Sequence, residues 1–165
     1  MSEDIKIGHN WRERLIRYAP LFLWTMIVLG FSSTQASSEQ TSRIFLPLLK
    51  FLFPSAPIET IEIYHAVIRK LAHLSEYGIL GFLSFRAFAR SSVQALKKYS
   101  FVASILSVLM VACIDEYHQS FEPTRTSSPW DVAIDMAGGI AGVGLLWLWM
   151  RVRKRNDPNP IASGP

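Results

Sequence analysis

The apolar residues of this chain fall into long blocks that are separated by short polar or charged stretches. A helix needs about 20 predominantly apolar residues to cross the ~30 Å core of a bilayer, and several blocks approach this length. We place four spans at about residues 15–33, 63–89, 99–119 and 130–150. Such blocks differ from the regular apolar stripe of a soluble amphipathic helix. The sequence therefore predicts an all-α integral membrane protein built as a four-transmembrane-helix bundle.

The stretch between the first two spans has a different pattern. Residues 32–42 are rich in Ser, Thr and Gln and are expected to form an extramembrane loop. Residues 43–53 are mostly apolar, but as a helix they would reach only about 16 Å, which is too short to span. Arg43 and Lys50 would hold this segment at the membrane surface. We interpret it as an interfacial segment between spans one and two.

The positive charges indicate an orientation. The chain has 17 Lys and Arg and a formal net charge of +4, which in a soluble protein would favour nucleic acid as a partner. Here these residues flank the apolar blocks, so we predict no nucleic-acid partner. With a cytoplasmic N-terminus, all but five of the 17 lie on the cytoplasmic side, as the positive-inside rule requires. Both termini are therefore predicted to be cytoplasmic.

Nothing in the sequence divides the chain into parts. We find no internal repeat, so we treat residues 1–155 as one membrane domain and residues 156–165 as a disordered tail. The single cysteine, Cys113, excludes a disulfide framework and a thiolate metal cluster. Because Cys113 lies inside an apolar run, we expect it to be a buried small hydrophobic residue.

The ionisable residues within the predicted spans lie at one depth. From Glu76, Asp115 and Asp135, each span continues toward the cytoplasm with apolar residues over roughly 14–22 Å of helix. We therefore expect these three carboxylates at one level in the outer half of the bilayer. An ionised side chain at a helix centre costs about 2.5–3.5 kcal/mol on insertion scales, so such groups need partners or water. We interpret them as a functional site, and a structural polar network that fixes helix register is the alternative.

Candidate roles follow from residue type and helical spacing. Proton transfer requires side chains that exchange a proton, and the candidate catalytic residues are His73, Glu76, Asp115 and Glu116. The candidate substrate-binding residues are Arg69, Lys70, Gln119, Arg125, Asp131 and Asp135. Asp131 and Asp135 are four residues apart and share a helix face, which continues as Gly138 and Gly142. This spacing of small residues predicts a close helix–helix contact beside the charges.

A metal site is a further possibility for these side chains. His73 and Glu76, at i and i+3 of a helix, would suit a pair of metal ligands, or equally a hydrogen-bonded pair. The sequence has no HExxH motif and no cysteine ligand, so we assign no metal ligand and name no cofactor. A metal-dependent membrane hydrolase or transferase therefore stays an alternative function, beside a structural or assembly protein.

Three segments, in this order and spacing, resemble the VanZ-like family, which is named after a teicoplanin-resistance protein. The first runs from Arg69 through His73 and Glu76 to Gly81, the second from Asp115 through Gln119 to Arg125, and the third from Asp131 through Asp135 to Gly139. Two residues depart from the family pattern. Thr124 stands where Gly is common, which indicates a different turn because Gly tolerates positive φ. Asp135 stands where Asn is common and adds a negative charge.

The resemblance implies a bacterial multi-pass protein of the inner (plasma) membrane, in a family whose founding member lowers susceptibility to a lipoglycopeptide antibiotic. We therefore expect a cell-envelope protein that binds or modifies a lipid head group, a lipid-linked envelope precursor or a lipoglycopeptide antibiotic. Its partners would be membrane lipid and an anionic amphiphile. The reaction, if any, and the oligomeric state stay open at this point.

Overall fold

The computed structural model describes residues 2–31, 38–121 and 129–156, and the regular secondary structure in these ranges is entirely helical. This confirms the prediction of an all-α fold. In chain order the helices are α1 (Ser2–Phe31), α2 (Ser38–Leu52), α3 (Ile58–Ala89), α4 (Gln94–Lys98), α5 (Ser100–Gln119) and α6 (Pro129–Asn156).

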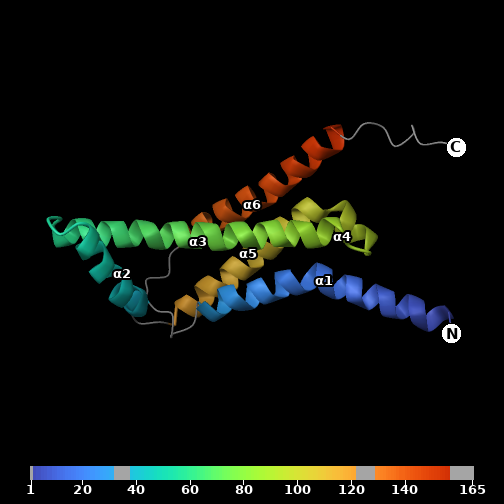
Figure 1. The fold of residues 1–165 in the computed structure, drawn as a ribbon, viewed down its shortest axis with the longest axis horizontal. Coiled ribbons are helices and arrows are strands. Elements are labelled where there is room, and N and C mark those ends of the chain that lie inside the picture. The colour runs from blue at the N-terminus through green and yellow to red at the C-terminus, as the bar shows by residue number, and fades with distance from the viewer. Residues whose placement is uncertain (1, 32–37, 122–128, 157–165) are drawn as a thin grey trace.

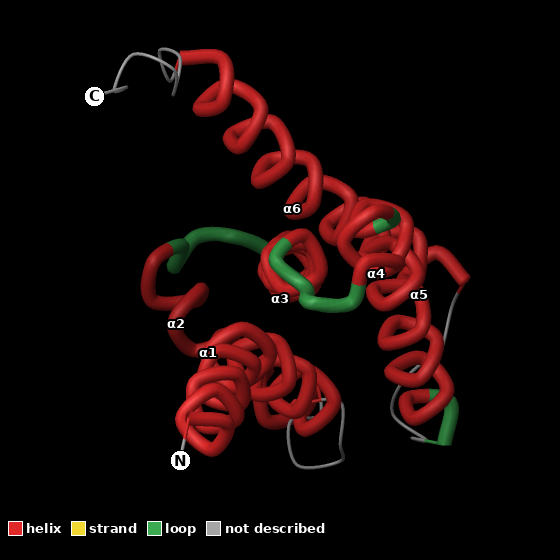
Figure 2. Tube along the Cα trace, turned by 90° about the vertical axis from the view of Figure 1, so that its right-hand side faces the viewer, coloured by secondary structure: helices red, strands yellow, loops and turns green. Residues whose placement is uncertain are grey.

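Helix α3 lies at the centre of the molecule and packs against α1, α2, α5 and α6 (Figures 1 and 2). Its 32 residues span about 48 Å. The main core cluster joins Val28 of α1 to Tyr77 and Leu80 of α3 and to Val108 and Ala112 of α5. The N-terminal end of α1 and the C-terminal end of α6 lie at the same end of the molecule as α4 (Figure 1).

The contact between α3 and α6 depends on glycine. A Cβ atom on Gly142 would overlap the carbonyl oxygen of Gly78, and one on Gly81 would overlap that of Gly139. The two backbones therefore touch directly at this crossing, a geometry that small interface residues also permit in membrane helix pairs. The close contact predicted from the spacing of Gly138 and Gly142 is confirmed.

Two local predictions differ from the structure. Helix α2 begins at Ser38, so the predicted loop at residues 32–42 is wrong from residue 38 onward. The C-terminal part of α2 packs on α3, since Leu49 is buried and the ring of Phe53, which follows α2, packs against that of Tyr64. Cys113 is exposed, so its predicted burial is wrong.

Two helices, α5 and α6, are long and apolar enough to cross a membrane. The first half of α3 is more polar, because it carries Glu59, Glu62, Arg69 and Lys70. Large apolar side chains are nonetheless exposed on all four long helices, for example Phe22, Ile79, Leu106 and Leu145. Apolar surface of this extent is typical of contact with a membrane or a partner.

Candidate functional site

Three helices bring ionisable side chains together near the middle of α3. His73 comes from α3, Asp115 from α5 and Asp135 from α6, and one potential ligand atom from each lies within 4.8 Å of the other two. Asp115 is 2% exposed and Asp135 is 3% exposed, whereas His73 is half-buried. We call these three residues the polar cluster. Counting apolar residues along the spans predicted Asp115 and Asp135 at one level in the membrane. The structure brings these two side chains together.

The Asp115 carboxylate is held by two hydrogen bonds to one oxygen. The Tyr77 hydroxyl donates to Asp115 Oδ2 at 3.0 Å, and Gln119 Nε2 donates to the same atom at 3.0 Å. Gln119 lies one helical turn after Asp115 on α5, so the helix itself positions this donor. Hydrogen bonds to an ionised carboxylate are stronger than neutral ones, so they fix the orientation of the Asp115 side chain.

Asp135 is held less tightly. Its Oδ1 atom lies 3.5 Å from His73 Nδ1, which forms an ion pair when the imidazole is protonated. This atom is fully buried, and no group in the described residues hydrogen-bonds to it. A second carboxylate, Asp115, lies nearby, and like charges at such a distance repel strongly where water is excluded. The site therefore favours positive charge between the two carboxylates.

The other predicted site residues lie within about one turn of a cluster residue on their helices, or beyond the described residues. Glu76 is half-buried on α3, one turn after His73. Glu116 and Asp131 are also half-buried, on α5 and α6 respectively. Arg69 and Lys70 lie one turn before His73, and Arg69 is half-buried whereas Lys70 is exposed. Arg125 falls outside the described residues.

A family model described as VanZ/LLP1 matches residues 18–150, which contain the whole polar cluster. This chain belongs to the VanZ/LLP1 family. The resemblance seen in the sequence motifs is thereby confirmed. No curated protein and no solved structure matches the chain. Family membership, together with the two apolar helices, supports a membrane-associated protein of the cell envelope or of antibiotic resistance.

Two residues at the site of this VanZ/LLP1 protein had no predicted role. Tyr77 is fully buried and binds Asp115, and Trp24 of α1 donates from Nε1 to the backbone oxygen of Glu76 at 2.9 Å. Tyr77 follows His73 by four residues, so the two side chains share a helix face, and this spacing could have predicted that Tyr77 belongs to the site. The sequence has no comparable signal for Trp24, because the contact depends on how α1 packs against α3.

An apolar groove between α3 and α6 begins beside the polar cluster. Its volume is about 330 Å³. Its lining comprises Leu74, Ser75, Gly78, Ile79, Phe82, Gly138, Ala141, Gly142 and Leu145. Leu74 is adjacent to His73 in sequence, and Gly138 lies three residues after Asp135. The groove therefore starts within one turn of the polar cluster on both helices, although no side chain of the cluster lines it.

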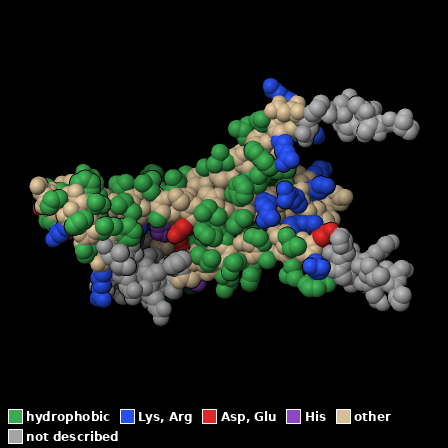
Figure 3. Space-filling view, in the orientation of Figure 1, with side chains coloured by type: hydrophobic (Ala, Val, Ile, Leu, Met, Phe, Trp, Pro, Cys, Tyr) green, Lys and Arg blue, Asp and Glu red, His purple; other side chains and the backbone are tan. Residues whose placement is uncertain are grey.

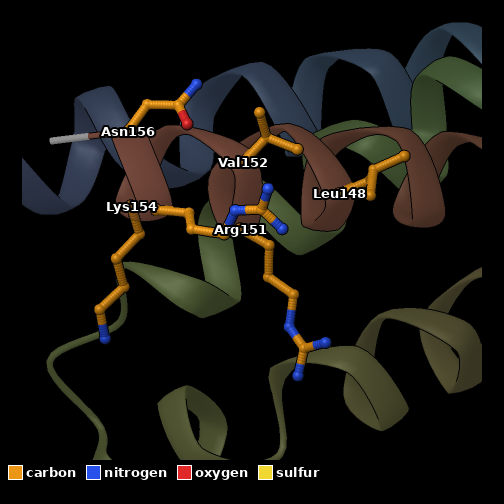
Figure 4. Close-up of a pocket in the computed structure, with 6 residues that line it drawn as sticks. Leu148, Arg151, Val152, Lys154 and Asn156 are labelled. Atoms are coloured by element: carbon orange, nitrogen blue, oxygen red, sulfur yellow. The ribbon is translucent and has the colours of Figure 1, made fainter.

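A second cavity lies at the opposite end of α6, far from the polar cluster. It has a volume of about 700 Å³, and Arg151 and Lys154 extend from the same side of the helix into this region (Figure 4). Arg151 also lies over the Trp147 ring at 4.4 Å from its centroid. A band of Trp and Arg is typical of a membrane–water interface.

Proposed function

We propose that this VanZ/LLP1 protein crosses the membrane four times, through α1, α3, α5 and α6, with both termini in the cytoplasm. The distribution of Lys and Arg supports this topology. On the face drawn in Figure 3, these side chains gather at the end of the molecule where α6 terminates. The same end carries the basic residues Arg86, Arg90, Lys97 and Lys98. Positive charge concentrates on the cytoplasmic side of membrane proteins.

The polar cluster then lies in the outer half of the bilayer. We propose that it binds the polar head group of an amphiphile in the outer leaflet: a lipid, a lipid-linked envelope precursor or a lipoglycopeptide antibiotic. The observation that carries this proposal is the position of the apolar groove beside the polar cluster. A buried polar site next to an apolar groove matches a ligand that has a polar head group and a hydrocarbon chain.

Different residues around the site would bind different groups of the ligand. His73, Glu76, Asp115 and Glu116 would exchange protons or hydrogen bonds with the head group. Cations suit an anionic group, and Arg69, Lys70 and Arg125 are the candidates, of which Arg125 is assigned from its position in the sequence. The remaining polar candidates are Gln119, Asp131 and Asp135.

Filling the groove tests the proposal. Ala141 lines the groove and is exposed, so Ala141→Trp would fill the groove without displacing a buried side chain. Ala137 is exposed on the same helix but does not line the groove, which makes Ala137→Trp a matched control. We expect mass spectrometry of gently purified protein to show loss of a co-purified amphiphile in the first variant only. Equal retention in both variants would contradict the proposal.

A second variant tests the polar part of the site. Glu76→Gln keeps the size and hydrogen-bonding capacity of the side chain but removes its charge. We expect it to fold normally and to lose bound amphiphile.

The topology is tested separately by placing a reporter in the connection between α5 and α6, where we expect an extracytoplasmic signal, and another at the C-terminus, where we expect a cytoplasmic one.

A further inference from the structure

The polar cluster has the composition of a transition-metal site. It contains one imidazole and two carboxylates, which come from three different helices and are the potential ligands identified among the described residues. Imidazole nitrogen combined with carboxylate oxygen suits Zn²⁺, Mn²⁺ or Fe²⁺, whereas Ca²⁺ and Mg²⁺ prefer oxygen ligands alone. Three protein ligands also leave at least one position open on a four-coordinate ion.

The distances fit such an ion closely. Ligands at about 2.0–2.2 Å from a tetrahedral ion lie about 3.4 Å from one another. His73 Nδ1 and Asp135 Oδ1 are 3.5 Å apart, which is already the separation that a bound ion requires. The widest separation in the cluster is no more than 4.8 Å, so a movement of at most about 1.4 Å by one side chain would complete the site.

An independent observation points to a missing ligand at this position. Asp135 Oδ1 is buried and receives no hydrogen bond within the described residues, and the Asp135 side chain is only 4% exposed. Buried carboxylate oxygens normally have a partner. This oxygen faces the imidazole at a distance longer than a normal hydrogen bond, and a cation between the two groups would satisfy both.

Electrostatics and the surrounding hydrogen bonds support the same conclusion. Two carboxylates with a neutral imidazole carry a charge of −2, and one divalent cation brings the total to zero, which is favourable where water is excluded. Metal-binding carboxylates are usually oriented by outer hydrogen bonds. Tyr77 and Gln119 supply such bonds to Asp115.

We propose that His73, Asp115 and Asp135 bind one divalent first-row transition-metal ion, with Zn²⁺ and Mn²⁺ as the probes to be used. The inference rests on the proposed function in one respect: the open position on the ion would accept an oxygen of the anionic head group.

The test uses the full chain, purified without a polyhistidine tag and kept in lipid nanodiscs. Elemental analysis should find about one transition-metal ion per chain. After chelation, Zn²⁺ or Mn²⁺ at a hundredfold excess over its dissociation constant should raise the Tm by about 5–10 °C. His73→Gln and Asp135→Asn should each abolish both effects.

The control variants are His118→Gln and Glu62→Gln. Both side chains are exposed, and they lie on α5 and α3, outside the polar cluster. They should bind the ion as the wild type does. Wild-type protein that holds no metal and shows no Tm shift with either ion would overturn the inference. Metal content that is the same in the wild type and in folded His73→Gln protein would also overturn it.

Measuring metal content and bound amphiphile on the same samples separates the proposed metal site from the proposed amphiphile binding. Metal binding that depends on His73, without any dependent amphiphile, would support the ion site and contradict the proposed function. Metal-free protein whose bound amphiphile is lost in Ala141→Trp would support the proposed function and contradict the ion site.

Discussion

Replacing Gly142 by alanine should separate α3 from α6. The added Cβ would overlap the carbonyl oxygen of Gly78 and would lie 2.8 Å from its carbonyl carbon and 3.0 Å from the backbone nitrogen of Phe82. Ordinary contacts of a Cβ atom begin at 3.4 Å. All three neighbours are backbone atoms of a continuous helix, so no side chain can rotate away. The helices would have to separate, which is the kind of backbone shift that overpacking forces.

The expected loss is about 1–3 kcal/mol in the free energy of unfolding. For a chain of this size each kcal/mol lowers the Tm by roughly 2–4 °C, so Gly142→Ala should melt about 2–12 °C below the wild type. Gly144 provides a matched control, because a Cβ there would meet no atom within 4 Å. Gly144→Ala should be neutral or stabilising by up to about 1 kcal/mol, since alanine favours the helix more than glycine does.

Thermal unfolding in nanodiscs, followed by tryptophan fluorescence, measures the effect. The chain has five Trp, and three of them, Trp130, Trp147 and Trp149, lie on α6 itself. The same chemical change at positions two residues apart should therefore lower the Tm at position 142 and not at position 144. A Gly142→Ala protein that melts at or above the wild-type temperature would refute the backbone contact between α3 and α6.

Three further predictions each concern a single side chain. Tyr77→Phe removes the hydroxyl that binds the buried Asp115 carboxylate, so it should lower stability by about 1–3 kcal/mol in the same melting assay, unlike an exposed Tyr64→Phe control. Trp24→Phe removes the hydrogen bond between α1 and α3 and should cost about 0.5–1.5 kcal/mol of unfolding free energy, and an unchanged value would contradict that contact. Cys113 is exposed on α5, so in the proposed topology it faces lipid, where a thiol does not ionise; a maleimide should label it slowly in nanodiscs and quickly after unfolding, and rapid labelling of the native protein would contradict this position.

Much of the architecture could be predicted from the sequence because a membrane restricts the choice of structure. Long apolar blocks can satisfy their backbone hydrogen bonds in lipid only as helices or closed barrels, and their length here favoured helices. Counting residues from the cytoplasmic flanks also placed Asp115 and Asp135 at one level. Both inferences use only helical rise and the thickness of the bilayer.

Helix faces were harder to predict, and Cys113 shows why. In a soluble protein an apolar residue usually faces the core, but in a membrane the lipid is as apolar as the interior. Val111, Ala112 and Cys113 are all apolar or nearly so, yet the first two are buried and Cys113 is exposed. The contact of Trp24 with Glu76 was hidden for a related reason, since it depends on the rotation of α1 about its axis. Only polar or small residues reveal which face points inward.

The glycines and the polar cluster are parts of one arrangement. Asp135 and Gly142 are seven residues apart, so they lie two turns apart on the same face of α6. An aspartate side chain is short, and it can reach His73 on α3 only if the two backbones approach closely, which Gly138 and Gly142 permit. A Cβ at position 142 should therefore lengthen the distance of 3.5 Å between His73 and Asp135 as well as lower the Tm. If so, Gly142→Ala should also weaken metal binding without altering any ligand, and Gly144→Ala should leave metal binding unchanged and the Tm no lower than that of the wild type.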